Sequence, residues 1–337
     1  MVRFGIIGTG RISDLVLKGA AQDPRIKIVA VCSRTAEAAE AFVRRNPMAA
    51  GAKIYTSVEA MTSDPQVDAV YVGTPNQTHC EYTMTSLKAG KHVLCEKPLA
   101  LNAAEGRRMI EAARESGCLL MEAMVSTLNP NFIAATERLK EIAPIRSYTS
   151  SFCQYSSKLE ALKMGEVGTA FKPGTAGALR DVGVYTLYPL VALFGKPNNV
   201  HGRMGTFETT EGVTDVYGSA FLGYEGMDAT LTWSKTFDSF QPTEIAGENG
   251  NLILDEIHIA RKAEIVPHAA PTSGQGPKPG RTLLSEGLPY NEYFYEFKEF
   301  ADLIEQGKKE SVHNSLTTSL AVLEIMDEVL SKKSMSL

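Results

Sequence analysis

The sequence lacks both a strong charge imbalance and any run of basic residues. Its 34 lysine and arginine residues stand against 39 aspartate and glutamate residues, which gives a formal net charge of −5 at pH 7. Proteins that bind nucleic acids or anionic bilayers usually carry clustered positive charge. We therefore expect neither a nucleic-acid partner nor a membrane partner.

Long apolar segments are also missing. No stretch approaches the roughly 18 apolar residues that span a bilayer, and residues 1–6 lack the long apolar region of a signal peptide. Cysteine is scarce, scattered and odd in number, which is typical of reduced core thiols and argues against a disulfide framework. We therefore expect a cytoplasmic protein whose thiols are buried: Cys32, Cys80, Cys95, Cys118 and Cys153.

Two kinds of catalytic pattern are absent from the sequence. No cluster of histidine, cysteine and aspartate has the spacing of metal ligands, so we expect no metal. No nucleophile elbow of the hydrolase type appears either.

With 44% hydrophobic and 22% charged residues, the chain has the composition of a globular protein. At about 150 residues per domain, its 337 residues predict roughly two domains.

The first 122 residues alternate between strand-like and helix-like segments. The strand-like segments are short and apolar on both faces, which is typical of buried parallel strands. The apolar residues between them recur at helical spacing. A repeated β-α-β pattern predicts an α/β fold with a doubly wound sheet. The predicted strands are residues 3–7, 27–32, 67–73, 91–96 and 118–122, and helical periodicity covers 12–20 and 102–113.

After about residue 123, strand-like segments follow one another, which favours a mostly antiparallel open sheet in an α+β arrangement. We therefore predict a dinucleotide-binding Rossmann domain over residues 1–122. Residues 123–337 would form an α/β substrate and dimerisation domain with closing C-terminal helices. Predicted there are strands 145–155, 200–207, 213–224, 227–237, 241–246, 250–255 and 258–266, helices 183–194, 291–306 and 314–331, and a long loop over 267–279.

A glycine-rich turn directly follows the first predicted strand. Residues 8–13 read Gly-Thr-Gly-Arg-Ile-Ser, a variant of the dinucleotide fingerprint. Its glycines permit a tight turn and close backbone approach, and the helix that follows presents unpaired N–H groups to a pyrophosphate. The position between an apolar strand and an amphipathic helix strengthens this otherwise weak motif. The predicted cofactor contacts are Gly8, Thr9, Gly10, Arg11 and Ile12.

The end of the second predicted strand indicates which dinucleotide is bound. A carboxylate there would accept a hydrogen bond from a ribose 2′-hydroxyl, whereas a cation accommodates a 2′-phosphate. The chain has Ser33 and Arg34 at this point and no carboxylate before Glu37. We therefore predict that NADP is the preferred cofactor and that NAD is the alternative. Arg34 as an ordinary solvated side chain is the competing interpretation.

Further cofactor contacts are predicted where residues 73–79 follow the next buried strand, because ligands of doubly wound sheets lie outside the carboxyl ends of the strands. His79 could be mistaken for a catalytic base, but a histidine at the start of a helix is more often a cap or a neighbour of the cofactor. The predicted contacts here are Thr74, Pro75, Asn76 and His79.

The tripeptide Glu96-Lys97-Pro98 comes at the end of the strand predicted over residues 91–96. Together with residues 74–76, 90–98 and 121–124, it resembles the Gfo/Idh/MocA oxidoreductases, over essentially the whole chain. Within that family the motifs are most similar to the dimeric dihydrodiol dehydrogenases and NADP-dependent D-xylose dehydrogenases. The resemblance implies that Lys97 is catalytic, and Glu96 and Lys97 complete the predicted cofactor contacts.

The chemistry of these residues agrees with that implication. Pro98 keeps Lys97 out of helical geometry, and an ammonium there would stabilise a developing alkoxide. Asp181 and Tyr185 lie four residues apart and would share a helix face. The pKa of a tyrosine is ordinarily near 10, and proximity to Lys97 would lower it enough for proton transfer. Asp181 would orient the substrate or the lysine. A core-facing ring is the competing interpretation of Tyr185.

Two positions depart from the usual family pattern. Ala176 stands where many relatives have glycine, and Arg180 replaces a usually apolar residue. Arg180 would either bind an acidic group of the substrate or face solvent.

The sequence thus predicts an NAD(P)-dependent oxidoreductase that transfers a hydride between nicotinamide and a carbinol or carbonyl carbon. A sugar, polyol or trans-dihydrodiol is the expected substrate. A non-catalytic NAD(P)-binding regulator and an oxidoreductase with tightly bound NADP are the alternatives. An open sheet with an apolar outer face would be an association site, and members of this family commonly pair these sheets. We therefore expect a homodimer through the C-terminal sheet.

Overall fold

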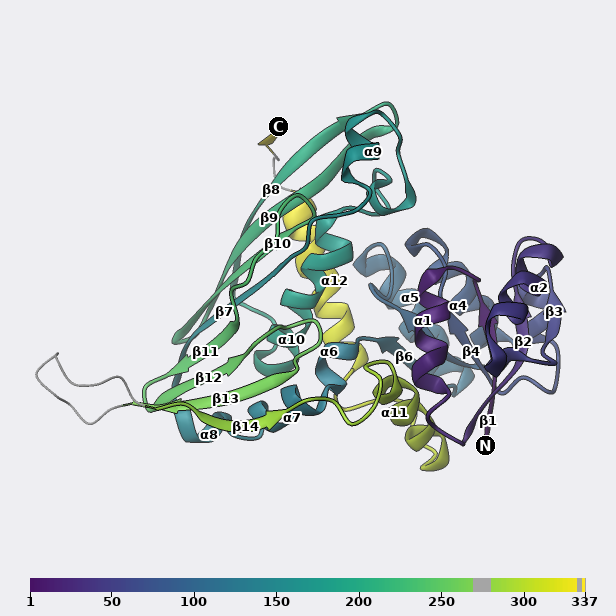
Figure 1. Ribbon diagram of the computed structural model, residues 1–337, viewed down its shortest axis with the longest axis horizontal. Coiled ribbons are helices and arrows are strands. Elements are labelled where there is room, and N and C mark those ends of the chain that lie inside the picture. Colours follow the sequence, from purple (N-terminus) through teal and green to yellow (C-terminus); the bar gives the residue numbers. More distant parts are fainter. Residues whose placement is uncertain (269–279, 332–334, 337) are drawn as a thin grey trace, which may run out of the picture. The chain divides into compact units, whose positions relative to one another are not determined.

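The computed structural model describes residues 1–268, 280–331 and 335–336 (Figure 1). Most of the predicted loop, residues 269–279, therefore lies outside the described residues. The chain folds into two compact units, and two separate segments build each of them. The first unit comprises Met1–Val125 and Tyr290–Leu323, and the second comprises Ser126–Pro289 and Glu324–Leu337.

The first unit contains a six-stranded sheet in the order β3-β2-β1-β4-β5-β6, with every neighbouring pair parallel. The predicted doubly wound sheet is confirmed. The short strand β3 at the sheet edge was not predicted, because three residues are too few to show a period. The strands are β1 (Val2–Ile7), β2 (Ile26–Cys32), β3 (Lys53–Tyr55), β4 (Ala69–Val72), β5 (His92–Glu96) and β6 (Leu120–Ala123).

Helices cover both faces of this sheet. On one face, Phe4 of β1 packs edge-on against Phe297, with ring centroids 5.3 Å apart. On the other face, Met109 and Ile110 join the core that contains Val70 and Val93. The helices are α1 (Arg11–Ala20), α2 (Ala36–Arg45), α3 (Val58–Thr62), α4 (His79–Lys88), α5 (Ala103–Ser116), α11 (Phe294–Glu305) and the beginning of α12 (Leu316–Ser331).

Helix α11 belongs to the first unit, although the predicted boundary put all of residues 123–337 in the second domain. The close approach of α1 and α11 explains this placement. A Cβ on Gly19 of α1 would lie 2.4 Å from the backbone nitrogen of Phe294, so only glycine fits there. The amphipathic pattern of residues 291–306 predicts a helix with a buried face. It does not specify which sheet that face covers.

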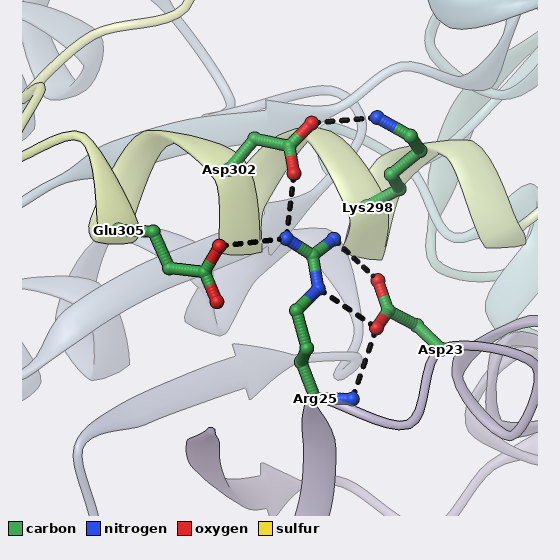
Figure 2. A network of polar contacts seen from close by, with 5 residues as sticks. All are labelled: Asp23, Arg25, Lys298, Asp302 and Glu305. Carbon is green, nitrogen blue, oxygen red and sulfur yellow. Dashed lines mark hydrogen bonds and ion pairs between the residues drawn. The ribbon is translucent and has the colours of Figure 1, made fainter.

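A network of ion pairs centred on Arg25 joins α11 to the residues before β2 (Figure 2). The Arg25 guanidinium pairs with Asp23 at 2.7 Å, with Asp302 at 2.7 Å and with Glu305 at 2.9 Å. Lys298 in turn pairs with Asp302 at 2.6 Å. Because Asp302 and Glu305 both lie on α11, this one arginine joins α11 to the six-stranded sheet.

The second unit contains a nine-stranded sheet within the described residues, in the order β14-β13-β12-β11-β7-β10-β9-β8-β15. The mostly antiparallel sheet is confirmed, with the β7–β10 and β8–β15 pairs parallel. The strands are β7 (Ile145–Cys153), β8 (Asn199–Thr209), β9 (Gly212–Tyr224), β10 (Met227–Ser234), β11 (Thr243–Gly247), β12 (Gly250–Leu254), β13 (Lys262–Pro267), β14 (Thr282–Glu286) and β15 (Met335–Ser336).

Helices pack against one face of this sheet (Figure 1). Val329 near the end of α12 occupies the space that a side chain at Gly202 of β8 would need, which seats the helix on the strand. The helices of this unit are α6 (Val125–Leu128), α7 (Pro130–Thr136), α8 (Leu139–Ile142), α9 (Leu159–Lys163), a π-helix at Leu179–Gly183, α10 (Val184–Phe194) and the end of α12.

The other face of the sheet is more polar than we expected. One row across β8, β9, β10 and β7 consists of His201, Phe221, Thr230 and Thr149. Among these, Phe221 is a large apolar side chain with 45% of its surface exposed.

No helix among the described residues is long and apolar enough to cross a membrane. All five cysteines lie within the described residues, where they are buried and form no disulfide bond.

Candidate active site

The glycine-rich turn after β1 is packed tightly against the turn after β4. Gly8 has a φ of 99°, and a Cβ there would lie 2.5 Å from the carbonyl oxygen of Gly73. The Ser13 hydroxyl at the last position of the fingerprint donates to the Gly8 carbonyl at 2.8 Å. Glycine is thus required at position 8 both by its dihedral angle and by the close contact. The hydrogen bond from Ser13 therefore links the glycine-rich turn to the first helical turn of α1.

The N-terminus of α1 suits an anion. Gly10 is the N-cap, and no side chain caps the first N–H groups of the helix. A Cβ at Gly10 would meet no atom within 4 Å, so the approach to these groups is open. Arg11 is exposed and Ile12 is half-buried beside this opening. Unpaired N–H groups and the positive end of the helix dipole fit the pyrophosphate of a dinucleotide.

The ends of β1 and β2 come together as predicted. The hydroxyl oxygens of Thr9 and Ser33 lie 3.0 Å apart, and Arg34 follows with an exposed side chain. Arg45 of α2 donates to the Thr9 carbonyl at 2.8 Å and pairs with Asp14 of α1 at 2.9 Å. The sequence analysis did not include Arg45, which braces the turn from a neighbouring helix. Hydroxyl groups beside an exposed guanidinium fit a 2′-phosphate.

The predicted residues after β4 form a compact turn, with Thr74 and Thr78 joined through their hydroxyl groups at 2.8 Å. Pro75 is exposed, and Asn76 begins a short 3₁₀ turn. His79 is fully buried, and its ring nitrogens lie 2.9 Å from the carbonyl oxygens of Thr74 and Pro98.

Burial lowers the pKa of His79, which favours the neutral ring. Because both ring nitrogens face backbone carbonyls, His79 is engaged in bracing the turns after β4 and β5. This arrangement agrees with its interpretation as a neighbour of the cofactor site and argues against a role as catalytic base.

Lys97 stands at the carboxyl end of β5, half-buried. The residue before it, Glu96, accepts a hydrogen bond from the Tyr71 hydroxyl at 2.6 Å and one from the backbone N–H of Lys97 at 3.2 Å. Strand β5 neighbours β4, which neighbours β1. Lys97 therefore belongs to the edge of the sheet at which the phosphate turn and Thr74 also lie.

In the second unit, Asp181 and Tyr185 lie on consecutive helical segments. Asp181 falls within the π-helix, whereas Tyr185 belongs to α10. The predicted helical spacing is thus interrupted by a π turn between them, a feature frequent at functional sites. The Asp181 carboxylate, whose side chain is 44% exposed, accepts an ion-paired hydrogen bond from the Lys235 ammonium at 2.6 Å.

Lys235 is a site residue that the sequence analysis did not predict. Its side chain is only 4% exposed, and its ammonium also donates to the Ala170 carbonyl at 2.9 Å and lies 4.4 Å from the centre of the Phe171 ring. Lys235 directly follows β10. The only sequence feature that could have indicated it is its position at the end of a strand, where functional groups often lie.

The Tyr185 ring borders an aromatic cluster. It meets Phe152 edge-on at 5.4 Å and His258 at 6.2 Å, and Phe152 stacks on His258 at 4.2 Å. The sequence analysis gave Phe152 no role and did not single out His258. Tyr185 itself is half-buried, so its ring is partly accessible.

Arg180 was predicted either to bind an acidic group of the substrate or to face solvent. In the structure it does not face solvent. It is only 8% exposed and lines a cavity of about 270 Å³ together with Thr206, Thr214 and Asp215. Burial raises the pKa of Asp215, while the nearby Arg180 acts in the opposite direction. Leu179, the residue before Arg180, donates its backbone N–H to the Asp215 carboxylate at 2.6 Å.

Comparison with known proteins identifies the family. The family model for oxidoreductases with an NAD-binding Rossmann fold matches residues 2–124, and the model for the GFO/IDH/MocA C-terminal domain matches residues 138–253. The chain is 39% identical over 332 residues to scyllo-inositol 2-dehydrogenase (NADP(+)) IolU of Bacillus subtilis, covering 97% of this chain and 96% of that protein. The chain belongs to the Gfo/Idh/MocA family.

Two further comparisons agree with this membership. A trans-1,2-dihydrobenzene-1,2-diol dehydrogenase of Xenopus laevis is 30% identical over 337 residues, with 97% of each chain covered. The 3-ketoreductase KijD10 of Actinomadura kijaniata, solved with NADP and TDP-benzene, superimposes with a TM-score of 0.83 at 24% identity, covering 100% of this chain and 99% of that one. This Gfo/Idh/MocA member is an NAD(P)-dependent oxidoreductase that acts on CH–OH groups.

Proposed function

We propose that this chain is an NADP-dependent dehydrogenase that oxidises a ring or chain CH–OH group of a polyol or sugar, or reduces the corresponding ketone. The observation that carries the proposal is Lys97 at the carboxyl end of β5, on the same sheet edge as the uncapped, glycine-lined start of α1. An anion-binding turn and a cation at one edge suit a dinucleotide whose reactive end lies near the lysine.

The cofactor is held by residues of the first unit. The uncapped N–H groups after Gly10 bind the pyrophosphate, and Ser33 with Arg34 binds the 2′-phosphate. Thr74, Pro75 and Asn76 border the nicotinamide half, and His79 fixes their turn. The bound dinucleotide supplies the hydride acceptor or donor, and the residues of the chain supply orientation and charge.

Charge stabilisation and proton transfer are assigned to Lys97 and Tyr185. The Lys97 ammonium stabilises negative charge that develops on the substrate oxygen. Tyr185 accepts the hydroxyl proton in the oxidation and returns it in the reduction. Asp181, held by Lys235, orients the substrate hydroxyl groups through its exposed carboxylate oxygen.

The names of the relatives narrow the substrate class. One relative is an inositol dehydrogenase and another a dihydrodiol dehydrogenase, and both names describe secondary alcohols on a six-membered ring. The stacked Phe152 and His258 rings, with Tyr185 edge-on to them, give this chain an aromatic surface, which suits the apolar face of a ring-shaped substrate. We therefore place cyclic polyols first and open or cyclic aldoses second.

The test is NADPH formation over a panel of inositols, aldoses and trans-dihydrodiols, run with NADP and NAD. The wild-type chain is expected to turn over at least one cyclic polyol, and Lys97→Ala should lower kcat on that substrate by about a thousandfold. Lys91→Ala, a change of the lysine at the opposite end of the same strand, is the matched control. Equal turnover by wild type and Lys97→Ala on every active substrate would refute the mechanism.

Assembly and location belong to the same proposal. We place a homodimer interface on the open face of the second-unit sheet, with Phe221 in its centre and hydroxyl-bearing side chains around it, and we place the protein in the cytoplasm. Phe221→Asp should yield monomers in sedimentation at micromolar concentration. A wild-type chain that sediments as a monomer would contradict the dimer.

A further inference from the structure

Three carboxyl groups in the first unit are buried and share electrostatic interactions with Lys97 or with one another. Glu96, Glu122 and Glu296 are 7%, 1% and 1% exposed. The charge of Lys97 influences the pKa of both Glu122 and Glu296, so these groups lie within electrostatic reach of it. Neighbouring carboxylates in a poorly solvated site cannot all be ionised. The arrangement therefore requires that some of them hold protons.

Of the three carboxyl groups, Glu96 has the surroundings that most favour its ionised form. Its Oε1 accepts from the Tyr71 hydroxyl at 2.6 Å, and its Oε2 accepts from the backbone N–H of Lys97 at 3.2 Å. Two donors that point at one carboxyl group favour its charged form. The negative charge of Glu96 is thereby held beside the lysine.

Glu296 has a contrasting environment. It lies on the face of α11 that packs on the sheet, next to Phe297, whose ring lies 6.1 Å from that of Tyr71. Its Oε2 has no hydrogen-bond partner among the described residues. Burial, followed by the charge of Glu96, raises the pKa of Glu296 well above its ordinary value, and Lys97 acts in the opposite direction.

Glu122 of β6 differs from both. The backbone N–H of Leu99 donates to its Oε1 at 2.9 Å, and burial raises the pKa of Glu122 to about 7. Glu122 therefore changes charge near neutrality, and burial raises the pKa of Glu296 in the same direction. Other titratable groups that interact electrostatically with this cluster include Tyr71, Cys95 and His79.

We propose that Glu296 is a positioning residue that keeps a proton at neutral pH, so that Glu96 carries the single negative charge of this pair beside Lys97. If Glu296 were ionised, a second negative charge would hold the ammonium against the protein interior and away from the substrate. If an apolar group replaced it, Glu96 would lie in less polar surroundings, which disfavours its charged form and weakens the counter-charge beside Lys97. The consequence for turnover rests on the proposed catalytic role of Lys97.

The protonation state can be measured without turnover. Infrared spectra of the full-length protein distinguish the C=O stretch of a carboxylic acid from that of a carboxylate. At about pH 8.5, above the pKa of about 7 of Glu122, the wild type should retain a buried acid band that Glu296→Gln removes and Glu122→Gln leaves in place. A wild-type spectrum whose acid band is unchanged by Glu296→Gln would overturn the proposal.

Kinetics on an active substrate then test the positioning role. Glu296→Gln preserves a neutral polar group and should keep kcat within about twofold of wild type, whereas Glu296→Leu should lower kcat about tenfold with a shifted pH profile. Glu299→Gln and Glu299→Leu, on the same helix but bonded to Ser311, serve as controls. Equal losses in both Glu296 variants, or wild-type kcat and pH profile in Glu296→Leu, would overturn the role.

These two measurements separate the inference from the proposed function. If Lys97→Ala keeps full turnover, the catalytic assignment of Lys97 fails while the infrared result still reports the state of Glu296. If Lys97→Ala abolishes turnover and the acid band is missing, only the Glu296 inference fails.

Discussion

The Lys235 ammonium lies 2.6 Å from the Asp181 carboxylate, and the lysine side chain is almost wholly buried while half of the aspartate faces solvent. The pair thus combines a partly exposed carboxylate with a buried cation that holds it. Because Lys235 also donates to the Ala170 carbonyl, its ammonium is fixed from two directions. A buried cation with such partners is a positioning group for the residue that it holds.

Lys235→Met should therefore impair turnover more than binding of the cofactor. Without the ammonium, Asp181 loses its anchor, and we expect kcat/KM for the polyol to fall roughly ten- to hundredfold, the effect of one charged hydrogen bond. The Kd for NADPH, measured by fluorescence, should stay within about twofold because the nucleotide residues belong to the other unit. Lys172→Met changes an exposed lysine and is the control. Wild-type kcat/KM in Lys235→Met would contradict the role.

Arg34→Ala tests the assignment of the 2′-phosphate contact. A guanidinium that binds this phosphate contributes about 1.5–3 kcal/mol, so the Kd for NADP should rise roughly ten- to hundredfold while the Kd for NAD changes little. Arg44→Ala removes an exposed arginine on α2 and serves as the control. A clear preference for NADP that survives in Arg34→Ala would refute the contact.

Arg25→Ala tests the link between α11 and the nucleotide-binding sheet. The substitution leaves Asp23, only 4% exposed, without its partner and removes two contacts to α11. We expect the free energy of unfolding to fall by about 2 kcal/mol, between the values for surface and buried pairs. Denaturant titration measures this change, with Arg44→Ala expected within about 0.5 kcal/mol of wild type. A negligible change in Arg25→Ala would mean that the network contributes no stability.

The sequence predicted the fold class and placed several candidate site residues at strand ends, for physical reasons that particular residues illustrate. Gly8, Ser33, Thr74 and Lys97 could be predicted because parallel strands bring their carboxyl ends to one edge, and each residue directly follows a recognisable strand. Lys235 could not be predicted in this way. It meets Asp181 from 54 residues away, and only the position of β10 beside the π-helix brings the two together.

Glu296 illustrates the same limit over a longer distance. It lies 200 residues after Glu96, in a helix whose amphipathic pattern shows one buried face but not the sheet that the face covers. The placement of α11 on the first unit depends on Gly19, Phe4 and Arg25, which make specific contacts with that helix. Periodicity alone therefore could not show that this helix packs with residues 1–125.

Glu122 makes stability depend on pH in a defined direction. Burial raises its pKa in the folded state to about 7 from the ordinary value of 4.5, so between these pH values the folded chain binds more protons than the unfolded one. By linkage, stability is highest below about pH 4.5 for this group and falls as pH rises to about 7. The difference of about 2.5 units corresponds to about 3 kcal/mol as an upper value.

Glu122→Gln removes this dependence because the amide oxygen can still accept from Leu99 N–H while carrying no charge. At about pH 8 the variant should unfold at a higher temperature than wild type, by several degrees, and the gain should shrink steadily as the pH is lowered towards 5. Thermal scans of both proteins across this range measure the effect, and Glu299→Gln provides a control with a carboxyl group that is only half-buried. A gain that is constant with pH would show that Glu122 is ionised throughout, since only a group that titrates between the two pKa values can produce the slope.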